Sequence, residues 1–522
     1  MKLSYHITGI KSVLASLMMG CLALFTGACS SETDEPVLPV EKGESYLKVT
    51  LVMPQVSRAE IHPDEPALES EDAVSDMTVF FFNGASGVDG DAATPFFRAV
   101  YINDGFTHTD NTLVVNVPLG NNYNYTDNDR IAVVTNMGNL TGLSTLGDLQ
   151  SYIPDATWQA TIQGSPSDCS RFAMTPAYNN DGMLYRNLSV SESEGSGIRY
   201  KATVGVERMA ARIDLEYDAL QENMSYIEYV STSRDDNSTV DGRVRLYGLS
   251  PINAMQLPSF ALKRTSYGLS DDYSCFSQWN YAADMPFDGS RPAAYIIEPR
   301  TSAKTTTADV PVAWYGGTSS DMMSKGLWNT DLNIETLLQD DKIKFPVDGR
   351  RAIVISYLNE NTQHYTAHSK KWLTGLMLRA VYVPSTVYAD GTATIAADYE
   401  PGQTFWLYRA NNAQGQQTVL YFISDEAALA YAEAHQSYNA EITSYPSGQC
   451  FYHAWLRHIV EEPEPDNDFP MEYGIVRNHI YRISFNFHNV GSPTPDIDEP
   501  RSAEAIIFVR PWNIFRHEQI II

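Results

Sequence analysis

The chain has 522 residues and a formal net charge of −28, because 64 acidic side chains stand against 36 basic ones. Such a surface repels phosphate backbones and anionic headgroups, which excludes nucleic-acid binding as a main function. A hydrophobic fraction of 43% can build large packed cores, so the chain is not a disordered tail. Only 19% of the residues are charged, so Asn, Ser, Thr, Gln and Tyr must supply much of the polar surface, as in many extracellular β proteins.

Residues 1–28 have the pattern of a secretory signal peptide. A short basic region precedes an apolar run at 13–25, which is too short to span a bilayer and ends in the small residues Gly27 and Ala28. Cys29 follows directly, and this order predicts cleavage before Cys29 and lipidation (palmitate) of its thiol. The alternative is an ordinary signal peptide with an incidental cysteine. Residues 29–45 are polar and acidic, and we expect them to form an unfolded tether.

The dominant hydrophobic period after this tether is two, which is typical of β-strands. In the first strand, Leu47, Val49 and Leu51 alternate with less apolar residues. Strands are predicted at 46–53, 77–82, 96–102, 112–117, 130–135, 199–206, 212–217, 243–247, 294–297, 351–357, 376–383, 404–409, 449–456, 480–488 and 505–509.

Three helices are predicted, at 145–153, 331–338 and 424–435. The last has Ser424 as a hydroxyl N-cap, followed by two acidic residues at the positive end of the helix. We therefore predict an all-β chain with minor helices, built from two domains in tandem. The N-terminal domain is placed at 59–217 and the C-terminal domain at 218–522, with the boundary after Tyr217.

The sequence has no recognisable catalytic constellation or metal-ligand pattern. His517 and Glu518 lack the second histidine of a zinc-protease motif, and Asp127 and Asp129 lack the remaining ligands of a calcium loop. We therefore expect no enzyme activity, no cofactor and no metal site, and leave calcium binding open. Three widely spaced cysteines of the mature chain, Cys169, Cys275 and Cys450, support neither a disulfide framework nor a zinc ribbon, and their pairing state stays open.

An ordered set of segments resembles the type V fimbrillins of Bacteroidales, in particular the minor-fimbrium (Mfa-like) branch and the FimA-like pilins. The segments are 77–83, 130–138, 206–214, 359–362, 473–481, 491–495 and 509–512. The resemblance extends over nearly the whole chain after the signal peptide. The resemblance implies two transthyretin-like β-sandwich domains and a structural subunit of a cell-surface fimbrium at the outer membrane that supports adhesion to host or bacterial surface ligands.

The resemblance also implies polymerisation with other fimbrial subunits by strand exchange. An arginine-specific protease would cut between Arg58 and Ala59 and remove residues 46–58, which leaves a groove for a strand of another subunit. A strand joined to a polar loop, as here, suits such a removable plug. The alternative is that Arg58 is an ordinary loop residue and the first strand is permanent, as in an uncleaved anchor.

The expected donor strand is the C-terminal segment 501–522. Its apolar candidates are Ile506, Phe508, Trp512, Ile520 and Ile522. An apolar chain end is unusual, because termini are normally exposed unless they are bound to something. The alternative for part of this segment is an internal last strand of the C-terminal domain.

The predicted function is therefore that of a fimbrial subunit exported as a lipoprotein precursor. An uncleaved anchor or a tip subunit of the same fimbrium remains an alternative. A second alternative is a SusD-like glycan-binding surface lipoprotein, but that class is built mainly from helices, and the period of two argues against it. A surface hydrolase is a third class, for which the sequence nominates no residues.

Overall fold

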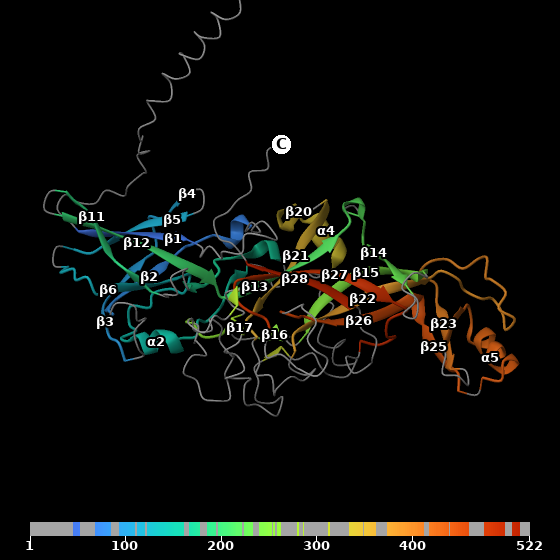
Figure 1. The fold of residues 1–522 in the computed structure, drawn as a ribbon. Coiled ribbons are helices and arrows are strands. Elements are labelled where there is room, and N and C mark those ends of the chain that lie inside the picture. The colour runs from blue at the N-terminus through green and yellow to red at the C-terminus, as the bar shows by residue number, and fades with distance from the viewer. Residues whose placement is uncertain are drawn as a thin grey trace, which may run out of the picture.

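The computed structural model of the chain describes residues 45–52, 68–84, 93–109, 112–120, 123–160, 166–177, 185–194, 197–221, 224–232, 240–252, 254–255, 258–262, 279–280, 285–286, 312–313, 333–347, 349–361, 373–411, 417–437, 439–458, 474–495 and 504–511. Within these residues the chain forms two large β-sheet assemblies that lie end to end, with short helices beside them (Figure 1). The prediction of a mainly β chain with two β-sandwich domains is confirmed.

The N-terminal sandwich has two layers that share one long strand, β12. One layer has the order β4-β5-β1-β12 and the other β3-β2-β6-β9-β12, while β11 lies beside β12 and β10 beside β6. The strands are β1 (Tyr46–Val52), β2 (Met77–Asn83), β3 (Phe96–Ile102), β4 (Thr107–Thr109), β5 (Thr112–Pro118), β6 (Asp129–Thr135), β9 (Met174–Pro176), β10 (Arg186–Asn187), β11 (Ser189–Glu194) and β12 (Gly197–Arg208).

The near-continuous apolar run of β2 is explained by burial of both its faces. Val79 and Phe81 point into the core between the two layers. Phe80 and Phe82 pack instead with Leu146 and its neighbours on the short helix α2 (Leu146–Ser151), which covers the outside of this layer. A strand that is covered on both faces reads as an unbroken hydrophobic run, and a strand that is covered on one face alternates.

The C-terminal sandwich has the strand order β20-β21-β13-β27-β14-β15-β22-β26, with β28 beside β27. Both halves of this path contribute to one core, which includes Leu215 of β13, Ile353 of β21 and Leu246 of β15. The strands are β13 (Ala210–Tyr217), β14 (Ile227–Thr232), β15 (Val240–Ile252), β20 (Lys344–Val347), β21 (Arg350–Asn359), β22 (Gly375–Pro384), β26 (Gln449–Trp455), β27 (His479–His488) and β28 (Glu504–Pro511).

A small sheet and a helix are inserted between the paired strands β22 and β26. The sheet has the order β24-β23-β25, with β23 (Phe405–Asn411), β24 (Gln417–Phe422) and β25 (Glu441–Tyr445). Phe405 and Leu407 belong to the main C-terminal core, whereas Tyr408 packs towards the helix α5 (Asp425–Ala434). The insertion is therefore a further layer at the end of the molecule that lies away from the N-terminal sandwich (Figure 1).

The shorter elements join these layers. They are η1 (Glu69–Glu71), β7 (Gln159–Ala160), η2 (Pro166–Asp168), β8 (Cys169–Ser170), η3 (Ala219–Gln221), β16 (Ala254–Met255), β17 (Trp279–Asn280), β18 (Met285–Pro286), β19 (Val312–Ala313), α4 (Ile334–Gln339), η8 (Asp341–Ile343) and η10 (Pro446–Gly448). Three small ladders, β16-β19, β17-β18 and β7-β8, are formed among them.

The chain passes from the first sandwich to the second at Met209, which separates β12 from β13. The amide of Met209 donates to the carbonyl oxygen of Ala173 in the N-terminal part, at 2.9 Å. Strand β13 then pairs with β21 and β27 of the second assembly. The change of sheet thus comes before β13, whereas the expected domain boundary was placed after it, at Tyr217, because hydrophobic alternation alone does not tell which sheet a strand joins.

The predicted elements that fall on described residues are present. The three helices are confirmed as α2, α4 and α5, and the Ser424 hydroxyl accepts a hydrogen bond from the amide of Ala427 at 3.1 Å, as an N-cap does. The predicted strand at 294–297 lies outside the described residues. Strands β14, β20, β24 and β25 were not predicted, since their short runs show no clear alternation of apolar and polar residues.

Replacing Leu246 by alanine tests the C-terminal core. Leu246 has no exposed surface and packs in the main cluster, so Leu246→Ala is expected to lower the free energy of unfolding by about 2–5 kcal/mol. Leu429 of α5 is 48% exposed and serves as the matched control, with an expected change of about 0.5 kcal/mol or less for Leu429→Ala. Urea denaturation of both variants measures the difference, and equal effects would contradict the assigned core.

Candidate strand-exchange site and ionic junction

Strand β1 is hydrogen-bonded along both of its edges, in the interior of its sheet. It runs parallel to β12 and antiparallel to β5. Its central residue, Val49, lies opposite Ala202 of β12 and Val115 of β5. Removing β1 from this position would leave both neighbouring strands with an unpaired edge.

The side chains of β1 alternate between the core and the surface. Leu47, Val49 and Leu51 have no exposed surface and belong to the same cluster as Val79 and Phe81 of the opposite layer. The intervening residues are partly exposed. Because each large buried apolar side chain contributes roughly 1.5–3 kcal/mol, the three together hold β1 firmly in place without a covalent bond to its neighbours.

The start of β1 is also fixed by polar contacts. The carbonyl oxygen of Ser45 accepts from the amide of Leu119 at 2.9 Å, and its hydroxyl oxygen accepts from the amide of Ile198 at 3.2 Å. The guanidinium carbon of Arg199 lies 5.5 Å from the ring centroid of Tyr46. The strand is therefore in contact with the segments on both sides of it from its first residue onwards.

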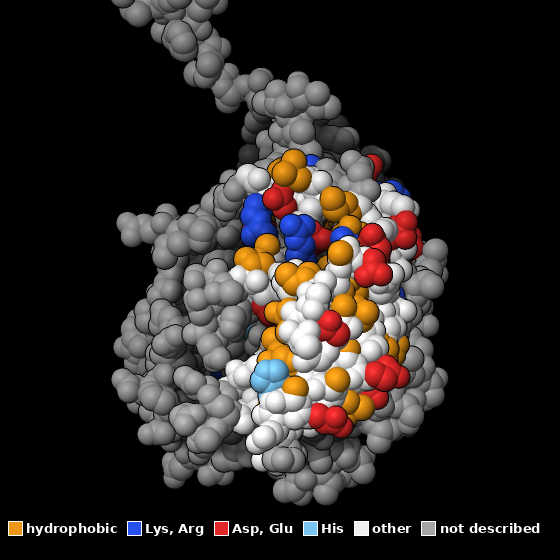
Figure 2. Space-filling model, turned by 90° about the vertical axis from the view of Figure 1, so that its right-hand side faces the viewer, with side chains coloured by type: hydrophobic (Ala, Val, Ile, Leu, Met, Phe, Trp, Pro, Cys, Tyr) orange, Lys and Arg blue, Asp and Glu red, His pale blue; other side chains and the backbone are white. Residues whose placement is uncertain are grey.

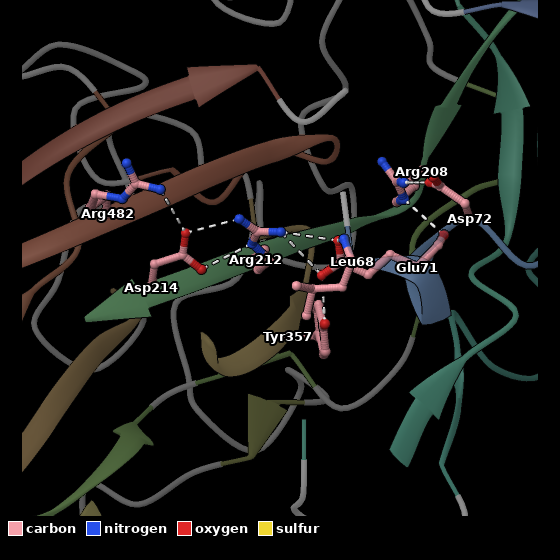
Figure 3. Close-up of polar contacts among 8 residues, drawn as sticks. All are labelled: Leu68, Glu71, Asp72, Arg208, Arg212, Asp214, Tyr357 and Arg482. Carbon is pink, nitrogen blue, oxygen red and sulfur yellow. Dashed lines mark hydrogen bonds and ion pairs between the residues drawn. The ribbon is translucent and has the colours of Figure 1, made fainter. Parts of the chain in front are cut away.

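A buried ionic junction begins where the chain is next described, at residues 68–72 beside η1. Figure 3 shows Glu71 between Arg212 of β13 and Tyr357 of β21. Its carboxylate accepts from Arg212 Nη1 at 3.0 Å, from the Tyr357 hydroxyl at 2.6 Å and from the amide of Leu68 at 2.7 Å. A single carboxylate therefore joins the segment before β2 to two strands of the C-terminal sandwich.

The junction continues on both sides of Glu71 (Figure 3). Asp72 forms an ion pair with Arg208 at the end of β12, and Arg208 Nε donates to the carbonyl oxygen of Glu71 at 3.2 Å. Asp214 accepts from Arg212 at 2.9 and 3.0 Å and from Arg482 of β27 at 3.3 Å. We call these residues, with Glu71 and Tyr357, the ionic junction.

Burial governs the electrostatics of the ionic junction. The charged side chains of Arg212, Glu71 and Asp214 have no exposed surface. Burial alone would lower the pKa of Arg212, but the carboxylates of Asp214 and Glu71 raise it above the ordinary value, so the guanidinium stays charged. Burial and then the charge of Glu71 raise the pKa of the Tyr357 hydroxyl well above its usual value. Tyr357 is therefore a permanent hydrogen-bond donor to Glu71.

A second buried ion pair lies between the residues just before β27 and just after β21. Arg477 Nη2 lies 2.8 Å from Glu360 Oε2, and neither side chain has exposed surface. The same guanidinium donates to the carbonyl oxygens of Ala261 and Phe260 at 3.0 and 2.7 Å. Arg477 thereby links the start of β27 with the segment that follows β16.

The C-terminal strand β28 occupies an edge of β27 in the same chain. The two strands are antiparallel, with His479 opposite Pro511 and Asn486 opposite Glu504. Strand β27 also pairs with β13, at Ile480–Ile483. Beyond the residues that pair with β28, it pairs with β14 at Phe487 and His488. In the isolated chain, residues 504–511 therefore form an internal last strand, which is one of the two expectations for this segment.

The structure places two of the proposed donor residues in β28, and the other candidate residues lie outside its described part. Ile506 lies opposite Ser484 and Phe508 opposite Arg482. Cys29, Arg58, Ala59, Trp512, Ile520 and Ile522 lie outside the described residues.

The sequence patterns did not single out the carboxylates of the ionic junction. The segment 206–214 was noted for its resemblance to the fimbrillins, and its arginines interrupt an otherwise apolar strand, which is the signal that could have indicated buried ion pairs. Glu71 and Asp72 carry no comparable signal, because they stand in a stretch of acidic residues that reads as an ordinary exposed loop.

Other chemistry on the described residues is limited. No group of three or more His, Cys, Asp or Glu side chains there could hold a metal ion. Cys169 and Cys450 are buried and are not joined to each other by a disulfide. Burial raises the pKa of Cys169 to about 12. Cys275 lies outside the described residues. Among the helices described, none has the length and apolar character needed to cross a membrane.

Comparison with known families identifies the C-terminal region. Residues 443–517 match the family described as "Major fimbrial subunit protein type IV, Fimbrillin, C-terminal". The resemblance to fimbrillins inferred from the motifs is thus confirmed for this region. No curated protein sequence matches the chain.

Solved structures of fimbrial proteins are similar over most of the chain at low identity. One is a fimbrilin (FimA) from Porphyromonas gingivalis W83, with 12% identity and a TM-score of 0.38 over 90% of this chain and 99% of that chain. Another is the tip fimbrial protein Mfa3 from Porphyromonas gingivalis, with 11% identity and a TM-score of 0.35 over 90% of this chain and 100% of that chain.

Removing the Glu71 carboxylate tests the ionic junction. Glu71→Ala leaves Arg212 buried with one carboxylate fewer, so the free energy of unfolding is expected to fall by about 3–5 kcal/mol. The control is Glu441→Ala, because Glu441 is 61% exposed and lies 3.8 Å from Arg409, a surface pair that contributes at most about 1 kcal/mol. Denaturant melts of the two variants measure the difference. Equal losses would mean that the ionic junction does not hold the sandwiches together.

Proposed function

We propose that the chain is a subunit of a cell-surface fimbrium that is exported as a lipoprotein precursor and polymerises by strand exchange after proteolysis. The fimbrillin C-terminal match at 443–517 supports the fimbrial class. In the proposed precursor, Cys29 carries the lipid and residues 29–45 form the tether. Cleavage between Arg58 and Ala59 then separates residues 46–58, including β1, from the rest of the subunit.

The observation that carries this proposal is the contrast between the two sides of the predicted cut. Before it, β1 is held by noncovalent contacts, through two backbone ladders and three buried side chains. After it, the segment 68–72 is bound by Glu71 and Asp72 to both sandwiches. A cut between these two segments would free β1 to leave while the new N-terminal segment stays bound.

The vacated groove would select its next occupant by side-chain pattern. Its walls are the strands β5 and β12, whose edges supply hydrogen bonds to any extended backbone. The sites now filled by Leu47, Val49 and Leu51 require apolar side chains at alternate positions. We propose that residues 501–522 of another subunit fill them, with Ile506, Phe508, Trp512, Ile520 and Ile522 as candidate anchors.

Donation would require β28 to leave its own subunit. In the isolated chain β28 is paired with β27 from Glu504 to Pro511. The strand would therefore exchange its ladder with β27 for a ladder in the groove of another subunit. The free-energy difference between the two states depends on how well the side chains of the strand fill each site. An uncleaved anchor or a tip subunit, in which β1 is permanent, remains the alternative within the same fimbrium.

A SusD-like glycan-binding lipoprotein is not favoured, because that class is mainly helical. The described helices α2, α4 and α5 are short, and the remaining regular structure is mostly strand. A structural fimbrial role also agrees with the expectation that the chain is not an enzyme.

Replacing Arg58 tests the proposed cleavage. Arg58→Ala is expected to accumulate as a longer, lipid-linked form that retains β1 and does not polymerise, because the arginine-specific protease has no cut site there. N-terminal sequencing of protein recovered from the cell surface measures this. The control, Arg171→Ala, removes an exposed arginine of the N-terminal sandwich and should be processed normally to Ala59. Normal fibres from Arg58→Ala would refute the removable-strand model.

Two truncations test the donor segment. Removing residues 512–522 leaves the β27–β28 ladder intact, so the monomer is expected to keep its melting temperature and lose polymerisation. Removing 504–522 also exposes an edge of β27, so the melting temperature is expected to fall as well. Size-exclusion chromatography and thermal melts measure both effects. Fibres formed normally without 512–522 would rule out Trp512, Ile520 and Ile522 as anchors.

A further inference from the structure

A small open pocket lies on the outer face of the C-terminal sandwich. It is lined by Tyr247 of β15, by Arg379, Ala380 and Val381 of β22, and by Gln449 of β26, and its volume is about 240 Å³. Val381 and Gln449 are direct neighbours across the β22–β26 ladder. The pocket is smaller than the roughly 300–1,000 Å³ typical of sites for drug-sized ligands, so it suits a ligand with no more than one ring.

A β-bulge in β15 lies beside the pocket and places Tyr247 in its lining. Leu246 lies opposite Ala380 and Gly248 lies opposite Arg379, so Tyr247 is the extra residue of a β-bulge. A Cβ atom at Gly248 would lie 3.5 Å from the Arg379 guanidinium, which is ordinary van der Waals contact, so Arg379 packs directly over this glycine. Bulges reorient side chains beside binding sites, and glycine in a strand permits close approach.

The rim of the pocket is aromatic and cationic. The Tyr247 ring lies 5.3 Å from the ring of Tyr226, and the guanidinium carbon of Arg245 lies 4.9 Å from the Tyr226 centroid. The Glu228 carboxylate holds Arg245 and Arg243 in place, each at 2.9 Å. Figure 2, a view onto the end of the molecule that carries the insertion, shows Lys and Arg in the upper part of that face, with acidic side chains among them, to the right and below.

We propose that this pocket binds a carboxylate-bearing sugar, with the ring against Tyr247 and the carboxylate on Arg379. A planar guanidinium matches a carboxylate with two parallel hydrogen bonds. Gln449 supplies amide donors and an acceptor for sugar hydroxyls. Burial lowers the pKa of Arg379, and a carboxylate placed next to it would raise that pKa again. The shared chemistry fits a sialic acid or a uronic acid on a surface glycan.

This inference concerns the folded monomer and does not depend on strand exchange. Isothermal titration of the purified chain with N-acetylneuraminic acid and with glucuronic acid tests it, with glucose and acetate as controls. At least one of the two acids is expected to bind, and glucose and acetate are each expected to bind at least tenfold more weakly. The relative affinities of the two acids distinguish the two sugar sources. Binding of neither acid, or equal binding of glucose or acetate, would overturn the proposal.

Variants separate the pocket from general effects on the fold. Arg379→Gln and Tyr247→Ala are each expected to weaken acid-sugar binding at least tenfold, and Tyr247→Ala covers the case in which Arg379→Gln fails to fold. Arg350→Gln, which alters a half-exposed arginine paired with Glu216, should bind as the wild type does. If both pocket variants keep their melting temperature and their sugar affinity, the proposal is wrong. Loss of self-association without loss of sugar binding would assign this face to subunit contacts instead.

Discussion

The structure depends on keeping buried charges paired where its two sandwiches meet. Arg208 and Arg212 stand on a nearly continuous strand, β12 to β13, that leaves one core and enters the other. A buried guanidinium without a carboxylate partner would lower the free energy of unfolding. Glu71, Asp72 and Asp214 are the carboxylates that pair with these two arginines. Since these acids come from separate segments, satisfying the arginines fixes how residues 68–72, β13, β21 and β27 are arranged.

This pairing gives the chain two classes of attachment. The segment 68–72 is held by buried ion pairs, and their loss would leave an uncompensated charge in a dry environment. Strand β1 is held by backbone ladders and by apolar side chains, which any extended segment of matching pattern can replace. An exchangeable strand beside a fixed segment is the arrangement that proteolytic assembly would use.

The C-terminal sandwich carries additions that leave its sheet intact. Strands β22 and β26 pair directly although the β23–β25 sheet and α5 lie between them in the chain. The insertion buries Phe405 and Leu407 on the main core, so it stabilises the end of the sandwich instead of hanging free. The bulge at Tyr247 is an irregularity of another kind. It adds one unpaired residue to β15 and lies beside the pocket that Arg379 lines.

The sequence by itself determined the fold class, the strands with clear alternation, the three helices and the Ser424 cap of α5. These features are local: side chains two residues apart share a face of a strand, and a hydroxyl before a helix caps its own backbone. It did not determine which sheet β13 joins, because that depends on partners such as β27, which is far away in the chain. Only the tertiary structure placed Glu71 beside Arg212 and Tyr357, since an acidic residue in a polar stretch has no local signal of burial. The central position of β1, likewise, follows from pairing with β5 and β12, and a run of alternating residues reads the same at an edge as in the middle of a sheet.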